Sequence, residues 1–268
     1  TLDGEVIALK RADGTPLWRA RLGSEVMAPP VSDGQVVVAR SVDGRIYGLS
    51  AADGTRLWVV DRSVPSLTLR GLSEPLLYGG RLFAGLDNGR LLALNPANGQ
   101  TLWEQSIATP SGRTELDRIT DIDAALVANG PYICAVSFGA ELACLDGDSG
   151  DVQWRRSIKS YSGMVLAGDL LIVTDEAGTV WALEAKTGAA AWKQDALAYR
   201  KLSPPAVFGG HVVVGDYEGY LHWLNPRDGA LVGRSRAGSD PLRAAMAAGD
   251  KLLYVLNTDG KLSAVTVQ

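Results

Sequence analysis

Few residues in this chain could do chemistry. Asp121 and Asp123 form an Asp-Ile-Asp pair, but calcium needs six or more oxygen ligands, and no loop with the required ligand series and glycine surrounds them. His211 and His222 are the only histidines, and each lies in an alternating apolar run, where a structural role is more common than catalysis. No serine nucleophile elbow, phosphate-binding loop or paired-histidine metal motif occurs. The sequence therefore predicts no catalytic residue, no metal site and no cofactor.

Cys134 and Cys144 are the only cysteines, and they lie on the two arms of one predicted hairpin, across a turn at residues 138–140. A disulfide between them is geometrically possible and would fit an oxidising compartment. In the alternative, both are small buried thiols that pack as apolar side chains, and the sequence favours this alternative. A metal site is not expected, because no histidine or third cysteine stands at a suitable spacing.

Two segments, residues 61–75 and 109–123, carry side chains suited to binding another protein. Apolar residues surrounded by charge are typical of a protein-binding patch, and arginine is a favoured anchor within one. Alternatively, the leucines fold inward and Arg70 pairs with Asp121 or Asp123, and the sequence does not decide between the two. The side chains concerned are Leu67, Leu69, Arg70 and Leu72 in the first segment, and Glu115, Asp117, Asp121 and Asp123 in the second.

These residues belong to a framework that repeats seven times along the chain. A full copy has a glycine (Ala140 in the fourth copy), a short alternating strand that ends five residues later, a second glycine and, after four more residues, a tryptophan. The copies recur every 38 to 51 residues, and fixed internal spacing at such a period is typical of a repeat architecture. The seventh copy reaches the C-terminus before its tryptophan. The tryptophans are Trp18, Trp58, Trp103, Trp154 and Trp192, and Gly233 stands in their place in the sixth copy.

Each period is expected to form one four-stranded antiparallel sheet. An upstream half, such as residues 30–39 or 205–214, adds two apolar runs of about five residues separated by glycine turns. No window shows the apolar 3.6-residue period of a helix. Four-stranded units of about 40 residues predict an all-β fold, a β-propeller. An open solenoid is the alternative, and antiparallel hairpins argue against it.

The repeated tryptophan has a structural interpretation. It lies on the fourth and outermost strand, where an indole can be buried between neighbouring blades while its N–H reaches a carbonyl oxygen. The glycine four residues earlier supplies the positive φ of the preceding turn. We expect these tryptophans to dock the blades against one another without any catalytic role. Because the sixth copy has Gly233 instead, one such contact should be missing there.

The two long segments both connect the fourth strand of one blade to the first strand of the next. The periods that contain them are 45 and 51 residues long, against 38 for the shortest. Function in repeat proteins is usually found in such insertions. Since all connections of this kind emerge on one face of a propeller, we expect the two segments to be spatial neighbours.

The bulk composition limits the possible partners. The 268 residues suffice for one large domain, residues 1–268, and the content of 46% hydrophobic and 21% charged residues is ordinary for a globular protein. A net charge of −4 without a basic run argues against nucleic acid as a partner. The chain starts at the third strand of a blade and ends before a fourth. We therefore expect an N-terminally truncated propeller with five complete blades, residues 26–236, and partial blades at both ends.

The repeat resembles that of the quinoprotein-type β-propeller family. Within that group, the non-repeat segments are similar to the lipoprotein family of the machinery that assembles outer-membrane β-barrels in Gram-negative bacteria. Three stretches carry the resemblance: Pro65-Ser-Leu-Thr-Leu-Arg-Gly71, Thr114-Glu-Leu-Asp-Arg-Ile-Thr-Asp-Ile-Asp123 and Gly215-Asp-Tyr-Glu-Gly-Tyr-Leu-His-Trp-Leu-Asn225. The repeat motif is moderately specific, whereas these three segments are far more so.

The resemblance implies an eight-bladed propeller, of which this chain carries the last seven repeats. It implies a non-enzymatic scaffold without a bound quinone, at the periplasmic face of the outer membrane, held by an N-terminal lipid anchor that this chain does not include. The implied partners are the periplasmic domains of the barrel-forming subunit and, in addition, unfolded outer-membrane protein clients. The implied contact residues are Leu67, Leu69, Arg70, Asp121 and Asp123.

A quinone-dependent dehydrogenase is the alternative function, because such enzymes use the same repeat. It would need a longer chain, a cofactor site on the propeller axis, a metal site and, commonly, two adjacent cysteines. The sequence has neither adjacent cysteines nor a cluster of polar residues at one phase of the repeat.

Overall fold

The chain is built from short β-strands throughout the part that the computed structural model describes, residues 1–65, 67–68, 73–108, 113–114 and 119–266. The strands are two to six residues long and are joined by turns, many of which contain a glycine at positive φ. Such short alternating segments are too brief to form helices. Among the described residues, no helix is long and apolar enough to cross a lipid bilayer.

The chain divides into two compact units, Thr1–Val152 and Gln153–Gln268. In the first unit, sheet one contains β1 (Glu5–Leu9) and β2 (Pro16–Arg21). Sheet two contains β3 (Val31–Ser32), β4 (Val36–Arg40), β5 (Ile46–Ser50) and β6 (Arg56–Val60). Sheet three contains β7 (Leu76–Tyr78), β8 (Arg81–Gly85), β9 (Arg90–Leu94) and β10 (Thr101–Ser106). Sheet four contains β11 (Val127–Asn129), β12 (Tyr132–Val136), β13 (Leu142–Asp146) and β14 (Val152–Arg156), and the division falls inside β14.

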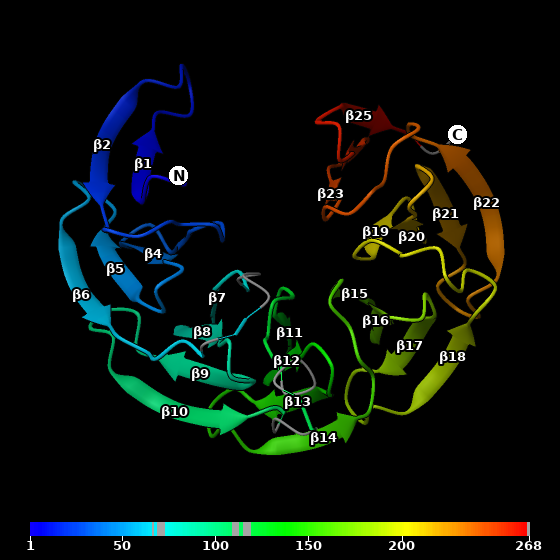
Figure 1. Ribbon diagram of the computed structural model, residues 1–268, viewed down its shortest axis with the longest axis horizontal. Coiled ribbons are helices and arrows are strands. Elements are labelled where there is room, and N and C mark those ends of the chain that lie inside the picture. The colour runs from blue at the N-terminus through cyan, green and yellow to red at the C-terminus, as the bar shows by residue number, and fades with distance from the viewer. Residues whose placement is uncertain (66, 69–72, 109–112, 115–118, 267–268) are drawn as a thin grey trace. The chain divides into compact units, whose positions relative to one another are not determined.

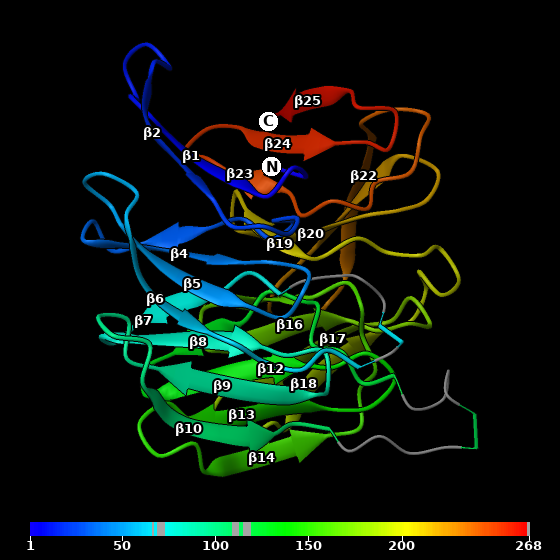
Figure 2. The ribbon, with the colours of Figure 1, turned by 60° about the vertical axis from the view of Figure 1, so that its left-hand side comes forward.

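The second unit contains the remaining three sheets (Figure 1). Sheet five contains β15 (Met164–Ala167), β16 (Leu170–Thr174), β17 (Val180–Glu184) and β18 (Ala190–Gln194). Sheet six contains β19 (Ala206–Phe208), β20 (His211–Gly215), β21 (Tyr220–Leu224) and β22 (Leu231–Arg236). Sheet seven contains β23 (Ala247–Ala248), β24 (Leu253–Leu256) and β25 (Leu262–Val265), and Figure 2 shows β24 beside β25.

The predicted fold class is confirmed by this topology. Every sheet is an antiparallel meander in which strands adjacent in sequence are hydrogen-bonded neighbours. In the described residues, five sheets have four strands and lie between Val31 and Arg236, within the range expected for complete blades. The two shorter sheets are the first and the last, where partial blades were expected.

The core lies between neighbouring sheets and is formed mainly by their second and third strands. In β9, for example, four of five residues are buried, whereas the outermost strands are largely exposed. One apolar cluster joins sheets three and four through Phe83, Leu91, Ile133 and Leu145. Within each unit the first strands of neighbouring sheets also touch: β3 touches β7, β15 touches β19, and β19 touches β23.

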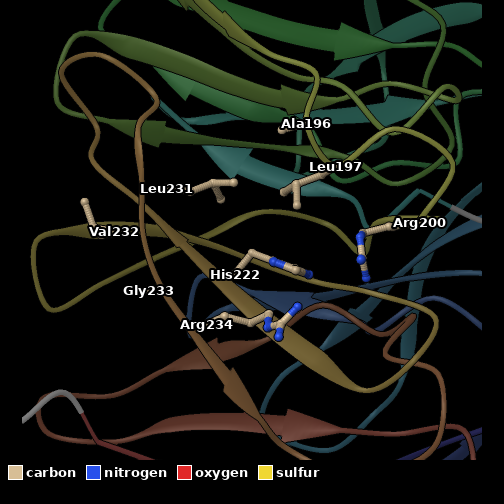
Figure 3. Close-up of a pocket in the computed structure, with 8 residues that line it drawn as sticks. All are labelled: Ala196, Leu197, Arg200, His222, Leu231, Val232, Gly233 and Arg234. Carbon is tan, nitrogen blue, oxygen red and sulfur yellow. The ribbon is translucent and has the colours of Figure 1, made fainter.

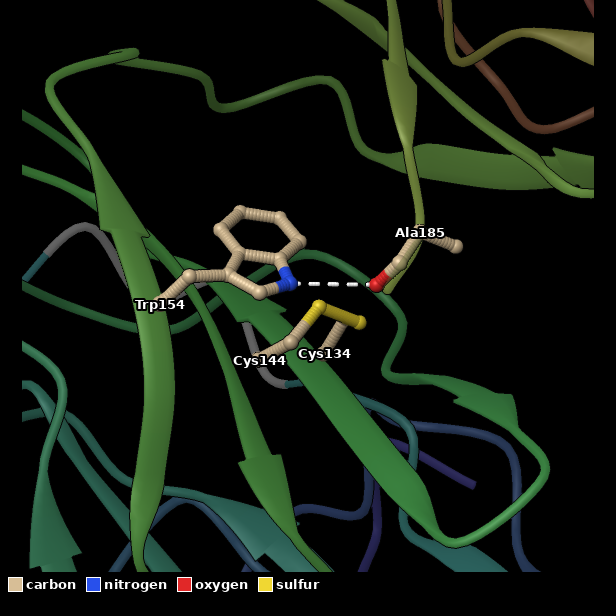
Figure 4. Close-up of a disulfide and its surroundings, with 4 residues drawn as sticks. All are labelled: Cys134, Cys144, Trp154 and Ala185. Atoms are coloured by element: carbon tan, nitrogen blue, oxygen red, sulfur yellow. Dashed lines mark hydrogen bonds between the residues drawn. A yellow bond between two sulfur atoms is a disulfide. The ribbon is translucent and has the colours of Figure 1, made fainter. Parts of the chain in front are cut away.

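The five repeated tryptophans make the same contact with the sheet that follows each of them. Each indole N–H donates a hydrogen bond to a carbonyl oxygen of that sheet, and the ring lies against the glycine of its last turn, as Trp58 lies against Gly99. A Cβ at Gly99 would come within 2.7 Å of the Trp58 ring. Figure 4 shows the bond from Trp154 to Ala185. The pairs are Trp18 with Ala51 (2.9 Å), Trp58 with Pro96 (2.8 Å), Trp103 with Gly147 (3.1 Å), Trp154 with Ala185 (3.0 Å) and Trp192 with Pro226 (2.8 Å).

The sixth sheet replaces this contact by a different one. In sheets one, two, three and five a small residue faces the tryptophan across the strand pair, as Gly48 faces Trp58. In sheet six the order is reversed, so that Gly233 on the outer strand faces Trp223 on β21. The Trp223 N–H donates to Ser235 Oγ of its own sheet at 3.0 Å, while its ring packs into the cluster shared with sheet seven. An indole is therefore retained at this position, but its hydrogen bond no longer links two sheets.

The interpretation of Cys134 and Cys144 as free thiols is wrong. A disulfide joins them (Figure 4), and no free cysteine remains. They stand directly opposite one another in the register of β12 and β13, so their side chains leave the same face of adjacent strands. Both residues are fully buried, as expected for packed thiols. Because the strand register places them directly opposite each other, they form a disulfide instead.

Candidate functional site

The two long connections of the first unit meet, as expected from their place in the repeat. One runs from β6 to β7 and the other from β10 to β11. Near their C-terminal ends, the buried hydroxyl of Ser73 donates a hydrogen bond to the carbonyl oxygen of Ala124 at 2.9 Å. A buried bond of this kind fixes the two connections relative to each other.

The Asp-Ile-Asp segment is held in place through its backbone. The N–H of Ile122 donates to the carbonyl oxygen of Leu86 at 3.2 Å, and the carbonyl oxygen of Asp121 accepts from the N–H of Phe138 at 2.9 Å. The Ile122 side chain is fully buried against Gly85, where a Cβ would overlap it. The backbone hydrogen bonds therefore hold the segment between the turns that follow β8 and β12 and fix the position of its two aspartates.

A buried ion pair lies beneath this segment. Arg40, at the end of β4, is 1% exposed and donates through Nη1 to the carbonyl oxygen of Gly85 and through Nη2 to Asp87, both at 2.6 Å. Buried pairs of this kind cost desolvation and gain only when the geometry is good, so they fix geometry more than they add stability. Nothing in the repeat pattern singled out either residue as part of the site. The available signal was a single arginine at the end of the apolar run Val36-Val-Val-Ala-Arg40, where a strand would otherwise be uncharged.

The pKa of Asp123 is raised to about 7. Burial is the largest cause, followed by the negative charges of Asp121 and Asp87, and Arg40 offsets them only in part. One Asp123 oxygen, Oδ1, is buried and has no hydrogen-bond partner among the described residues. Arg40 is already paired with Asp87, so its guanidinium stabilises the ionised form of Asp123 only in part.

Of the five candidate partner-binding residues, the structure describes three, and they differ in exposure. Leu67 is 40% exposed, so it does not fold inward. Asp121 is 1% exposed and belongs to the buried charge cluster, whereas Asp123 is partly exposed beside it. Leu69 and Arg70 lie outside the described residues. The Asp-x-Asp pair is thus less accessible than a protruding loop would make it, and Asp123 is its more exposed member.

The two histidines have structural contacts. His222 is buried, and its Nε2 lies 2.8 Å from Asp216 Oδ2, so it supports the turn that Asp216 forms. His211 Nδ1 lies 2.9 Å from the carbonyl oxygen of Gly209. Within the described ranges, no group of three or more histidine, cysteine, aspartate or glutamate side chains has the arrangement of a metal site.

Comparison with known proteins identifies a family. The family model described as outer membrane protein assembly factor BamB matches residues 1–194. The protein of that name from Xanthomonas campestris pv. campestris is 48% identical over 265 residues, which cover 98% of this chain and 65% of the relative. The one from Escherichia coli K12 is 37% identical and is covered to 67% of its length. The chain thus spans about two thirds of the length of these relatives.

A solved structure supports the same relationship. The crystal structure of BamB from Moraxella catarrhalis superimposes with a TM-score of 0.92 at 28% sequence identity. The match covers 100% of this chain and 80% of the crystallised one. The chain accordingly has the β-propeller fold built from antiparallel sheets.

Proposed function

The chain belongs to the BamB family of outer membrane protein assembly factors, and from this membership we propose that it is a non-enzymatic scaffold of the machinery that assembles outer-membrane proteins. Its relatives are named as assembly factors, and that name describes help given to other proteins, not a reaction. The rigid sheets hold loops in fixed positions, as a scaffold requires. We place its action at the periplasmic face of the outer membrane, where client β-barrel precursors are assembled.

The proposed partner is the barrel-forming subunit of that machinery, bound through its periplasmic domains. The docking site combines the two long connections of the first unit. It consists of Leu67, Leu69 and Arg70 from the first connection, and Asp121 and Asp123 from the second. The observation that carries this proposal is the Asp123 carboxylate, which is held rigidly beside two other carboxylates and has an oxygen without a hydrogen-bond partner among the described residues.

The two aspartates have different parts in this proposal. Asp121 is buried and helps to set the negative potential of the site. Asp123 is partly exposed and accepts a cationic side chain of the partner. A partner arginine or lysine at this point replaces the missing counter-charge, so binding and ionisation of Asp123 support each other. Leu67 supplies exposed apolar area on the first connection, as interface anchors require.

Calorimetric titration with the periplasmic domains of the barrel-forming subunit tests the proposal. Loss of a central anchor costs about 2 kcal/mol or more, so Arg70→Ala and Asp123→Ala should each weaken binding roughly thirtyfold. Asp250→Ala removes an exposed carboxylate elsewhere and should leave affinity unchanged. If folded Arg70→Ala and Asp123→Ala bind as tightly as the unmodified chain, the two connections are not the docking site.

A further inference from the structure

The sixth sheet carries a cluster of cations on tyrosine rings. In the described part of the chain, four of the five cation–π pairs use two tyrosines that stand three residues apart, at the turn after β20 and the start of β21. We call the two tyrosines, Tyr217 and Tyr220, and the four cations that lie over their rings the tyrosine–cation surface. The pairs are Lys201 and Arg243 on Tyr217, at 5.0 and 5.6 Å from the ring centre, and Arg234 and Arg236 on Tyr220, at 4.7 and 5.0 Å.

The cations of this surface lack acidic partners. Among the described residues, none of the four forms an ion pair with a carboxylate. The first sheet offers a direct comparison, because Arg19 and Arg21 follow Trp18 at the positions where Arg234 and Arg236 follow Gly233. There, Glu5 pairs with both arginines, at 3.5 and 3.8 Å.

The difference between the two sheets lies in one residue of the neighbouring strand. Glu5 stands opposite Arg21 in the register of β1 and β2, and Tyr220 stands opposite Arg236 in that of β21 and β22. Tyrosine in place of glutamate keeps the guanidinium groups ordered over a ring but leaves their charge uncompensated. The surface thus holds positive charge that no ion pair with a described carboxylate neutralises.

The turn that presents Tyr217 is rigid. Its first residue, Asp216, is 1% exposed and accepts backbone N–H groups of Glu218 and Tyr220, each at 2.9 Å. Burial acts to raise the pKa of Asp216, but bonds from His222, the Tyr220 N–H and Arg200 outweigh it and lower that pKa. Fixing the rings before binding reduces the conformational entropy lost on association.

A hollow of about 440 Å³ opens beside Arg234 (Figure 3). Its apolar wall contains Leu197, Leu231 and Val232, and Val232 is 54% exposed. The last two belong to β22, the terminal strand of its sheet, which leaves its outer backbone edge unpaired within that sheet. An apolar wall, a charged group and an open backbone edge together suit a polypeptide better than a small ion or a lipid headgroup.

We propose that the tyrosine–cation surface binds an extended acidic segment of a partner protein. Arg234 and Arg236 are two residues apart on one strand face, so their Cα atoms are about 7 Å apart. Alternate side chains of an extended peptide repeat at the same distance. Carboxylates at alternate positions of the segment pair with these arginines, and an apolar side chain enters the hollow. This surface is distinct from the two connections of the first unit and goes beyond the scaffold function proposed above.

The test measures binding of the whole chain to a fluorescent peptide with glutamate at alternate positions, and to the same peptide with glutamine there. The glutamate peptide should bind and the glutamine peptide should not. Arg234→Gln/Arg236→Gln should weaken binding more than about tenfold. Arg19→Gln/Arg21→Gln is the matched control, because it removes the same charge from equivalent positions where Glu5 already compensates it, and it should change affinity less than about twofold.

A gain-of-charge variant strengthens the test. Tyr220→Glu places a carboxylate where Glu5 stands in the first sheet, and it should abolish binding while both arginines remain. Circular dichroism confirms that each variant is folded. Equal loss in both double variants, or equal binding of both peptides, would overturn the proposal. Binding to vesicles of anionic phospholipid, lost in Arg234→Gln/Arg236→Gln but without binding of the glutamate peptide, would also overturn it in favour of a lipid surface.

Discussion

At the scale of single residues, the most informative group is Asp123 and its charged neighbours. Its pKa is raised to about 7 because it is buried next to Asp121 and Asp87, with Arg40 as the nearby cation. The buried Arg40 also joins Asp87 and Gly85, so a residue of sheet two sets the position of a turn in sheet three. Three carboxylates are thus held close together at fixed positions. In the proposed docking, a cationic side chain of the partner would pair with them.

The stability of the chain should depend on pH through Asp123. Its folded-state pKa of about 7 exceeds the unfolded value of about 3.9, so the folded state binds more protons between these values. The free energy of unfolding should therefore fall as the pH rises from about 4 to about 7, and remain lower above that range. Asp123→Asn should remove this part of the dependence and be more stable than the unmodified chain at pH 8, by about 1 kcal/mol or more, since one pKa unit corresponds to about 1.4 kcal/mol.

Melting temperatures of both proteins between pH 4 and pH 8 check this prediction. Asp250→Asn is the control, because that carboxylate is exposed, and its curve should follow that of the unmodified chain. Parallel curves for Asp123→Asn and the unmodified chain would show that Asp123 does not titrate in this range.

Truncation of a repeated tryptophan should be costly. Trp58 is 8% exposed, packs on Gly99 and donates to Pro96, so Trp58→Ala should cost about 3–5 kcal/mol of unfolding free energy. The neighbouring Leu57 is 50% exposed on the same strand, and Leu57→Ala should change stability by less than about 0.5 kcal/mol. Urea unfolding followed by circular dichroism measures both, and similar losses in the two variants would contradict the docking role of the indole.

At the scale of the strand pair, the chain uses one large and one small residue facing each other in the last two strands of a blade. Gly48 faces Trp58, Ala93 faces Trp103, and the pair is reversed in Gly233 and Trp223. In both arrangements one indole ring fills the space between the two strands, so the packed volume is about the same. The hydrogen-bond acceptor differs: Trp58 donates to Pro96 of the next sheet, and Trp223 donates to Ser235 of its own sheet.

Two glycine substitutions test this pairing. A Cβ at Gly48 would overlap the Trp58 ring, so Gly48→Ala should cost about 1–3 kcal/mol through overpacking. At Gly233 the nearest atom, of Trp223, lies 3.7 Å from the added Cβ, and φ is not positive there. Gly233→Ala should therefore be neutral within about 0.5 kcal/mol. Chemical denaturation of the two variants compares them directly, and an equal cost would show that the strand pair has room to adjust.

The sequence predicted the features that repeat and missed those that join distant residues. The spacing of glycine and tryptophan is local, so the sheets and the place of the five indoles were accessible from it. Arg40 and Asp87 are 47 residues apart and resemble ordinary strand-end charges, so their pairing was not. The disulfide depended on a register of β12 and β13 that composition does not determine. The position of Trp223 opposite Gly233, where the repeated tryptophan is missing, likewise depended on the register of β21 and β22.

At the scale of the whole molecule, each unit carries one charged surface, acidic in the first unit and basic in the second. The first unit has the carboxylates around Asp123, and the second has the tyrosine–cation surface. Opposite charges on separate surfaces suit a scaffold that binds different segments of its partners, because each surface disfavours the ligand of the other. Neither surface needs the sheets to move, since rigid turns and buried bonds hold both.

Site-specific photocrosslinking tests the docking claim most directly. A photoreactive amino acid replaces Leu67, which is 40% exposed in the first connection, or Leu102, which is 44% exposed on β10 and outside the proposed site. In a mixture with the periplasmic domains of the barrel-forming subunit, position 67 should crosslink to that subunit and position 102 should not. Crosslinks from position 102 alone, or equal crosslinks from both, would contradict docking through the two connections.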